Sequence, residues 1–408
     1  MKETVIRYFH PLFLVKEFKQ AGGMGLNYLV YLVYPILIVG TFWGAKVSGR
    51  KQWNEECFSL EQMKAVQAVA ALCIVLHHVG QKTCADWLPK GQIIPGLEPF
   101  VPIGYLLVSI FLFCSGYGLY KSYCTKENYL KGFCRKRILP VVLTGYMVTL
   151  LYFVARLVMG EHMSVGRAIG YLTGLRLCNT NGWFVYALPV LYLGFYFGFR
   201  FCKKERNAFL VTTLVALVYI WIGTCINHND ILFCGEWWYN SIIAFPAGLY
   251  FARFERQVTE HIRRFYLIYL ILALLLYNPL FELGEIAQMR LSYYGESWGA
   301  EHIILRRWGC VIAQALISFD FLCIVWLLSM KIKLGNRLLA FFGTITLELY
   351  LVHGLFVELF SRSFLGNRKP IFFCSNVALY ICIVLILSIP LALLLKKLVG
   401  RIRSGFAS

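Results

Sequence analysis

MKAVQAVAALCIVLHHVGQ, at residues 63–81, has the composition of a membrane-spanning helix. Lys64 is its only charged residue, and its apolar side chains cover close to the roughly 20 residues that a helix needs to cross a bilayer. Ten-residue alternating segments, typical of a membrane barrel, are absent from the chain. Eleven apolar runs follow one another, near 27–45, 65–81, 99–120, 138–155, 177–199, 207–227, 237–252, 265–281, 308–330, 338–361 and 371–395. The sequence therefore predicts an all-α, polytopic transmembrane protein with about eleven spans.

The overall composition indicates the same class of protein. Hydrophobic residues make up 59% of the 408 residues, against about 45–50% in an average soluble domain. Charged residues make up only 15%, against about 25%. A soluble protein this apolar would expose large sticky patches and aggregate, whereas lipid solvates an apolar surface.

The net charge of +19 indicates topology rather than binding to nucleic acid. The Lys and Arg residues lie in short clusters between the apolar runs, and no basic stripe alternates with aromatic residues. When the loop at 121–137 is assigned to the cytoplasm, six segments fall on that side and hold 24 Lys and Arg, against 11 in the opposite loops. The six segments are 46–60, 121–137, 200–206, 253–264, 331–337 and 396–403.

The N-terminal segment and the cysteines indicate what the chain lacks. Residues 5–18 can form an amphipathic helix that lies on the membrane surface, and no cleavable signal peptide is evident. The 14 Cys residues are scattered singly, and neither CxxC nor HExxH occurs. The sequence therefore predicts no disulfide framework, no bound metal ion and no bound cofactor.

Polar residues inside the run at 65–81 are candidates for chemistry, because ionisable groups within a span are costly. Gln67 and His78 lie eleven residues apart, close to three full helical turns, so they share a helix face, and Lys64 lies one turn earlier. This line of polar residues ends at His77 and His78, near the outer boundary of the membrane. Histidine can accept and return a proton near neutral pH, although a histidine pair at a headgroup boundary without chemistry has the same pattern.

Three other segments have both a functional and a structural interpretation. NYLKGFCRKRILPVV at 128–142 is either a stop-transfer cluster before a helix or a site for a phosphate-bearing donor. In GTITLELYLVHGLF at 343–356, Tyr350 and His353 can meet, whereas Glu348 lies on another face, and a paired core histidine is the alternative. The third is a set of residues near the outer surface that forms either an interfacial aromatic belt or a platform for a sugar ring. Its members are Asn181, Trp183, Glu236, Trp237, Trp238 and Tyr239.

Taken together and in this order, the 63–81 stretch, FLFCSGYGLY at 111–120, CRKRILP at 134–140 and LELYLVH at 347–353 resemble the acyltransferase-3 superfamily. The resemblance covers about residues 60–395 and implies a ten-helix core, with residues 1–59 as an added amphipathic segment and span, 60–396 as the core and 397–408 as a basic cytoplasmic tail. It implies transfer of an acyl group, usually acetyl, from cytoplasmic acyl-coenzyme A to hydroxyls of a glycan or glycolipid outside. That activity places the protein in the plasma membrane.

The resemblance also assigns residues. His78 matches the family's histidine, whereas Gln67 stands where the family has Arg, and Lys64 can replace that charge. Cys134 interrupts the family's spaced arginine pair. The further matches are Ser115, Gly116, Tyr117, Arg137, Ile138, Leu139, Pro140, Trp183, Phe184, Tyr350 and His353.

A mechanism follows as a hypothesis. The donor phosphates would bind Arg135, Lys136 and Arg137, and the pantetheine arm would pass along the side lined by Lys64, Gln67 and Ser115. His78 would act as general base on the acceptor hydroxyl, or would carry the acyl group itself. The residues left to orient it or to stabilise the oxyanion are His77, Tyr350 and His353, with Glu348 as a further catalytic candidate.

Two other function classes remain open from the sequence. A transporter or exporter of a glycolipid or small acid would use Asp320, Glu348 and Glu358 as a proton relay. A non-catalytic relative would explain the Arg that is missing at Gln67.

Overall fold

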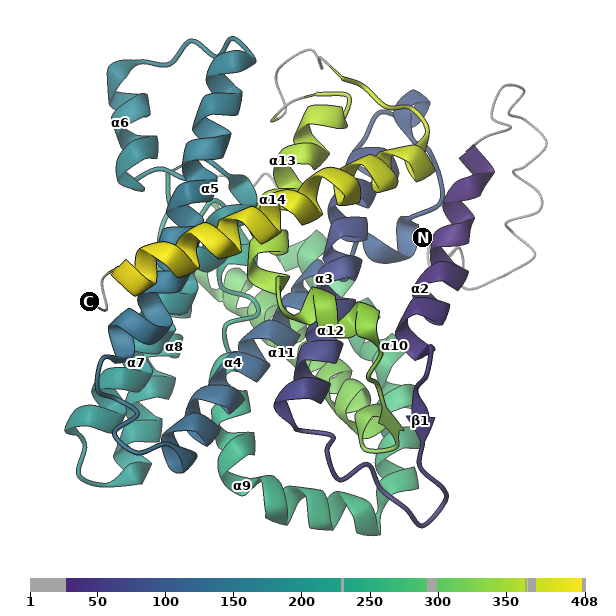
Figure 1. Cartoon of the computed structure of the whole chain (residues 1–408), viewed down its shortest axis with the longest axis vertical. Helices are drawn as coiled ribbons and strands as arrows, with labels where there is room; N and C mark the ends of the chain where they lie inside the picture. Colours follow the sequence, from purple (N-terminus) through teal and green to yellow (C-terminus); the bar gives the residue numbers. More distant parts are fainter. Residues whose placement is uncertain (1–26, 229–230, 292–298, 364, 366–371, 406–408) are drawn as a thin grey trace.

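The structure is a computed structural model that describes residues 27–228, 231–291, 299–363, 365 and 372–405. Long helices dominate these residues, in agreement with the predicted all-α membrane class (Figure 1). The amphipathic helix predicted at 5–18 lies outside them. The helices and strands are η3 (Asn27–Leu32), α2 (Val33–Phe42), β1 (Lys46–Val47), α3 (Leu60–Thr83), η4 (Lys90–Gln92), η5 (Glu98–Phe100), α4 (Gly104–Thr125), the π-helical turn η6 (Cys134–Ile138), α5 (Leu139–Val158), α6 (Val165–Thr173), η7 (Thr180–Trp183), α7 (Phe184–Phe201), α8 (Glu205–Cys225), η8 (Glu236–Trp238), α9 (Ala244–Arg264), α10 (Tyr266–Leu291), α11 (Ile303–Ser329), β2 (Ile332–Lys333), α12 (Arg337–Gly343), α13 (Thr346–Phe360) and α14 (Val377–Gly405).

The number of spans is where the structure departs from the sequence prediction. Among the described residues, seven helices are long and apolar enough to cross a membrane, and an eighth span results if α12 and α13 are counted as one. These two helices are bent by 82° at the break between them, so the run at 338–361 is not one straight helix. The run at 237–252 is also interrupted, because α9 begins only at Ala244 and continues into the charged residues up to Arg264. The predicted count of eleven is therefore not confirmed.

α3 lies at the centre of the bundle. Its start is fixed by Ser59, whose side chain accepts a hydrogen bond from the Gln62 N–H as an N-cap. Small residues on one face, Ala65, Ala68 and Ala71, allow α12, α13 and α14 to pack closely against it. The opposite face contacts α4, so His77 and His78, near the far end of α3, are surrounded by other helices.

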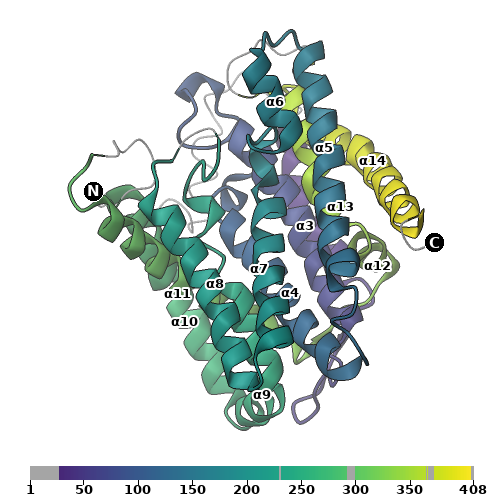
Figure 2. The same ribbon diagram turned by 90° about the vertical axis from the view of Figure 1, so that its left-hand side faces the viewer.

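The basic loops gather at one end of the molecule. Figure 1 shows the segments 46–60, 126–137, 200–206 and 253–264 at its lower end, and Figure 2 shows the turn between α7 and α8 beside α9 at that end. The opposite end carries α6 and the segment 84–103. Four of the six segments predicted to be cytoplasmic thus lie at one end, whereas the basic end of α14 lies half-way up the view in Figure 1. The side of the membrane on which the lower end lies stays a prediction.

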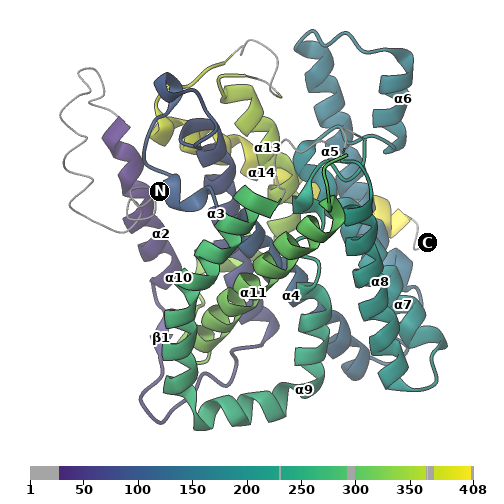
Figure 3. The same cartoon turned by 180° about the vertical axis from the view of Figure 1, so that it is seen from behind.

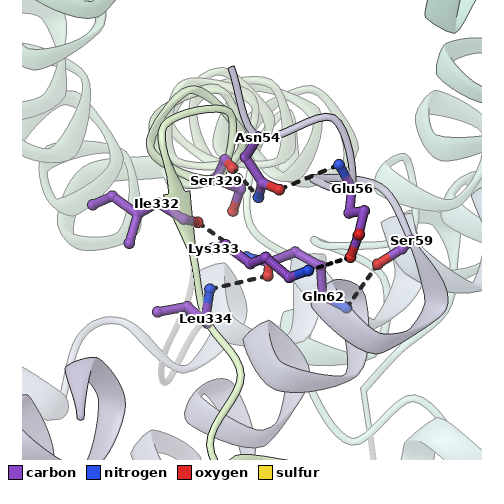
Figure 4. A network of polar contacts seen from close by, with 8 residues as sticks. All are labelled: Asn54, Glu56, Ser59, Gln62, Ser329, Ile332, Lys333 and Leu334. Atoms are coloured by element: carbon purple, nitrogen blue, oxygen red, sulfur yellow. Dashed lines mark hydrogen bonds and ion pairs between the residues drawn. The ribbon is translucent and has the colours of Figure 1, made fainter. Parts of the chain in front are cut away.

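A network of polar contacts at the basic end connects the N-terminal region to the last third of the core (Figure 4). β1 pairs antiparallel with β2, with Lys46 opposite Lys333. The Gln62 amide donates to the Ile332 carbonyl and accepts from the Leu334 N–H, at 3.3 and 3.0 Å. The α2 end is held in the same way, because the Asn336 amide donates to the Gly40 and Trp43 carbonyls.

Glycines set the closest helix contacts in the core. A Cβ on Gly116 of α4 would lie 2.0 Å from the Phe245 carbonyl oxygen, and one on Gly248 of α9 would lie 2.0 Å from the Phe113 carbonyl oxygen. α4 and α9 therefore touch through their backbones. Behind them, α10 and α11 run side by side along the back of the molecule (Figure 3).

Candidate active site

The structure brings two histidines from distant parts of the chain into direct contact. His78 Nδ1 on α3 lies 2.6 Å from His353 Nε2 on α13, although the residues are 275 positions apart. The two rings are stacked with 4.9 Å between their centroids. His353 is fully buried, whereas His78 is partly exposed. One member of this pair is therefore partly accessible.

The hydrogen-bond pattern fixes which nitrogens carry protons. His353 Nδ1 lies 2.8 Å from the Leu349 carbonyl oxygen, which can only accept, so this nitrogen must donate. In the neutral ring His353 Nε2 is then an acceptor, and it accepts from His78 Nδ1–H. His78 Nε2 is left with its lone pair, and no hydrogen bond to it is found in the described part of the chain. The lone pair of this atom can therefore accept a proton.

His77 has a different role from its neighbour. Its Nδ1 donates to the Phe100 carbonyl oxygen at 2.9 Å, so the ring is held against the segment before α4. A Cβ on Gly104, the first residue of α4, would lie 2.4 Å from His77 Nε2. The glycine therefore makes room for the ring. His77 positions the start of α4 beside the histidine pair and makes no hydrogen bond to His78.

Two polar groups that the sequence did not single out for catalysis point at α13 one residue after His353. A Cβ on Gly354 would lie 2.7 Å from Tyr152 Oη and 2.9 Å from Asn181 Nδ2. Tyr152 is buried on α5, and its hydroxyl has no hydrogen-bond partner within the described residues. An unpaired hydroxyl is costly inside a protein, so its presence beside His353 calls for an explanation. No sequence motif marks Tyr152, so only the fold identifies it as a candidate.

The loop before α7 is clamped to α13 at the same place. The Asn179 amide donates to the Leu351 carbonyl oxygen at 3.3 Å, and its side-chain oxygen accepts from the Asn181 N–H at 2.9 Å. The Tyr350 ring packs edge-on against Phe184, with its centroid 6.2 Å from that of His353. Tyr350 and His353 thus lie near each other, as their spacing predicts.

An ion pair lies one helical turn beyond the histidines on both helices. Lys82 Nζ is 2.7 Å from Glu358 Oε1, and Glu358 Oε2 accepts from the Leu365 N–H at 2.7 Å. Glu358 is thereby neutralised. No hydrogen bond or ion pair joins it to Glu348 or Asp320 within the described residues, so these contacts give no relay of the kind expected of a proton-coupled transporter.

The residues predicted to hold the donor phosphates lie away from the histidines. Arg135 and Lys136 are exposed on η6, at the basic end. Arg137 is engaged, since its Nε donates to the Tyr129 hydroxyl at 2.8 Å and its plane lies 5.5 Å from the centre of that ring. The structure places this cluster at the predicted cytoplasmic entrance to the bundle and leaves its ligand a prediction.

The other predicted residues are not in contact with the histidine pair. Gln67 and Lys64 are partly exposed on α3, and the Lys64 backbone meets Gly343 at the break before α13. Ser115 is partly exposed on α4. Glu348 lies in the first turn of α13, and no hydrogen bond or ion pair reaches either histidine from it in the described structure. Their assigned roles stay predictions.

Two of the predicted outer aromatic residues, Trp183 and Trp238, are buried. Trp183 is 5% exposed and Trp238 1%. Both an interfacial belt and a sugar platform require an accessible ring face, so neither interpretation holds for these two residues. They instead pack in the core, where Trp183 lies edge-on to Phe184 and Trp238 lies against Tyr186. The described residues also contain no group of three or more His, Cys, Asp or Glu that could hold a metal ion.

Comparison with known proteins assigns the chain to a family. A family model described as an acyltransferase domain matches residues 60–397, which is most of the chain. The chain belongs to the acyltransferase-3 family. The family expected from the motifs is thus confirmed, and the protein is a multi-pass membrane acyltransferase. No curated protein and no solved structure matches it.

Proposed function

We propose that this acyltransferase moves an acyl group, acetyl in the first place, from cytoplasmic acyl-coenzyme A to a hydroxyl of a glycan or glycolipid outside the plasma membrane. The observation that carries the proposal is the histidine pair, in which Nε2 of the partly exposed His78 keeps a free lone pair inside an acyltransferase bundle. A base near the outer end of a helix whose other end lies among basic loops suits a donor and an acceptor from opposite sides.

The reaction needs one base and donors for one oxyanion. His78 Nε2 takes the proton from the acceptor hydroxyl, whose oxygen attacks the thioester carbonyl carbon. The charge that develops on the carbonyl oxygen is stabilised by hydrogen bonds from Tyr152 Oη–H and Asn181 Nδ2–H. The carbon–sulfur bond then breaks, and His78 returns the proton to the leaving thiolate. The products are the ester and free coenzyme A.

His353 supports this base in the manner of the third group in a catalytic triad. It accepts from His78 Nδ1 and is itself oriented by the Leu349 carbonyl. The protonated His78 keeps that hydrogen bond, so the imidazolium is stabilised as it forms. His353 is a positioning residue, because it acts through His78.

The donor reaches His78 from the basic end. His78 lies 18 residues after the first residue of α3, a rise of about 27 Å along the helix. The phosphates would stay at Arg135, Lys136 and Arg137 while the pantetheine arm passes Lys64, Gln67 and Ser115 towards the interior.

The test is acyl transfer from radiolabelled acetyl-coenzyme A to cell-envelope glycan in membranes that contain each variant. His78→Ala should lower the rate by at least ~10³-fold, because it removes the base. His353→Leu should lower it by about 10–100-fold, and His353→Gln should recover part of that loss, since an amide oxygen can accept from His78 Nδ1–H. His162→Ala is the matched control, since His162 is exposed on the loop before α6.

Folding is checked by the retention volume of each variant in detergent. Full activity of a folded His78→Ala protein would contradict the role of the base. Inactivity of the wild-type protein with acetyl-coenzyme A and activity with a longer acyl-coenzyme A would correct the acyl group and keep the mechanism.

A further inference from the structure

A cavity of about 610 Å³ lies far from the histidines, at the turn between α7 and α8 on the basic end. Most of its lining residues are exposed, so it is an open hollow at the surface. The residues that line it are Phe201, Cys202, Lys203, Lys204, Arg206 and Asn207. Three of them are cations and none is acidic, so the cavity suits an anion.

The one acidic residue of this turn is turned away from the cavity by other contacts. Glu205 Oε1 accepts from the Tyr120 hydroxyl at 2.5 Å, and Glu205 Oε2 pairs with Arg253 Nε at 2.9 Å. No ion pair or hydrogen bond to the side chains of Lys203, Lys204 or Arg206 is found within the described residues. The positive charge of the turn is therefore not compensated by the protein.

The start of α8 adds to the attraction for an anion. Lys204 occupies the N-cap position, and its side chain makes no capping hydrogen bond. A helix of 21 residues begins here, with a partial positive charge and N–H groups directed towards the turn. Phosphate is the anion that combines best with such N–H groups and with an arginine.

The cavity has no passage to the interior between α7 and α8. A Cβ on Gly198 would lie 2.7 Å from the Ala208 carbonyl oxygen, and one on Gly194 would lie 2.9 Å from Val215 Cβ. The two helices are thus in backbone contact directly above the turn. A donor with its phosphate in this cavity could not send its thioester between these helices to His78.

An exposed apolar strip on α7 begins at the edge of the cavity. Phe201 forms part of its wall and is 70% exposed, and Phe197, one turn deeper, is 50% exposed. Their rings are stacked, with centroids 6.0 Å apart. An apolar chain attached to the bound anion would lie along these rings in the hydrocarbon region.

We propose that this cavity binds the headgroup phosphate of an anionic phospholipid, whose acyl chains lie against Phe197 and Phe201. Lys203, Lys204 and Arg206 hold the phosphate, and the first turn of α8 contributes N–H groups. The site differs from the donor site at Arg135, Lys136 and Arg137, and it does not depend on the proposed reaction.

The experiment is native mass spectrometry of the full chain in detergent, titrated separately with phosphatidylglycerol, phosphatidylcholine and coenzyme A. The test variant is Lys203→Gln/Lys204→Gln/Arg206→Gln. The control is Lys397→Gln/Arg401→Gln/Arg403→Gln, which removes the same charge from exposed positions on α14. We expect the test variant to lose at least ~10-fold in affinity for phosphatidylglycerol, and the control to lose less than ~3-fold.

Phosphatidylcholine should bind the wild-type protein more weakly, and coenzyme A should bind the wild type and the test variant equally. Equal losses of phosphatidylglycerol affinity in both triple variants would show that binding depends on the net charge of the protein and not on the cavity. That result would overturn the proposal. Loss of coenzyme A binding in the test variant, with phosphatidylglycerol binding kept, would assign the cavity to the donor and would also overturn it.

Discussion

The proton on His78 Nδ1 determines which atom is proposed to act as base, and a neighbouring backbone carbonyl determines where that proton lies. Leu349 makes His353 a donor at Nδ1, and His353 in turn leaves His78 Nε2 unprotonated. The arrangement uses a neutral imidazole where a serine-protease triad uses a carboxylate. The base is therefore oriented without a buried negative charge, which would be costly inside a bilayer.

Tyr152 gives the sharpest test at this scale. Tyr152→Phe removes a buried hydroxyl that has no described partner, so the melting temperature should stay the same or rise. Transfer should nevertheless fall by about 10²-fold, because an oxyanion donor is lost. Thermal unfolding in detergent and the radiolabel assay measure the two effects.

Tyr186→Phe is the matched control for that variant. The Tyr186 hydroxyl donates to the Gly174 carbonyl oxygen at 2.8 Å, and the residue takes no part in the proposed chemistry. Its loss should cost about 0.5–1.5 kcal/mol of stability and leave transfer unchanged. If Tyr152→Phe lowered stability and kept activity, the hydroxyl would be structural and the oxyanion assignment would be wrong.

Only part of this residue-level description could be predicted from the sequence. His78 and His353 could each be selected as ionisable residues in apolar runs, because such residues are costly there. Their direct contact could not be predicted, since nothing local relates positions 275 residues apart. Tyr152 was not predictable either, because a tyrosine in an apolar run is ordinary until the fold shows that its hydroxyl lacks a partner.

At the scale of the helices, the glycines of α4 do two different things. Gly116→Ala would place a Cβ 2.0 Å from the Phe245 carbonyl oxygen, and a backbone atom cannot move aside as a flexible side chain can. We expect α4 and α9 to be forced apart, with a loss of about 1–3 kcal/mol in stability, seen as a lower melting temperature in detergent.

Gly118 provides the control on the same helix. A Cβ there would meet nothing within 4 Å, so Gly118→Ala should be neutral or should stabilise the helix by up to ~1 kcal/mol. Equal melting temperatures for the two variants would show that the contact between α4 and α9 is looser than described. The family's Ser-Gly-Tyr match at 115–117 therefore has a packing role at its central residue, whatever Ser115 does.

The element scale also explains why the apolar run at 338–361 is not one straight helix. Hydropathy locates apolar residues, and the helices lie where the apolar runs are. It does not show the 82° break between α12 and α13, because Gly343 and Thr344 are unremarkable in a run that is apolar on both sides. The break arises from packing, since Gly343 rests on the Lys64 backbone of α3.

For the whole molecule, the orientation in the membrane can be tested with cysteines already present. Cys134 is exposed on η6 at the basic end. A membrane-impermeant maleimide should label it only after cells are permeabilised, because the positive-inside rule places this end in the cytoplasm. Cys57, in a loop at the same end, should react poorly at pH 7, since burial raises the pKa of its thiol to about 11.

His162→Cys supplies the opposite control. His162 is exposed on the loop before α6, so its cysteine variant should be labelled in intact cells. Labelling of Cys134 without permeabilisation, together with protection of residue 162, would invert the topology. The direction in which the acyl group crosses would then be inverted as well.

The network of polar contacts that joins β1 and α2 to β2 and α12 has a consequence for biosynthesis. Gly40 is translated first, yet the Asn336 side chain that holds it lies 296 residues later. At a synthesis rate of ~5–20 residues per second, about 15–60 s separate the exit of the two partners from the ribosome. During that interval the end of α2 lacks the side chain that later holds it, so the contact can form only when the last third of the protein arrives.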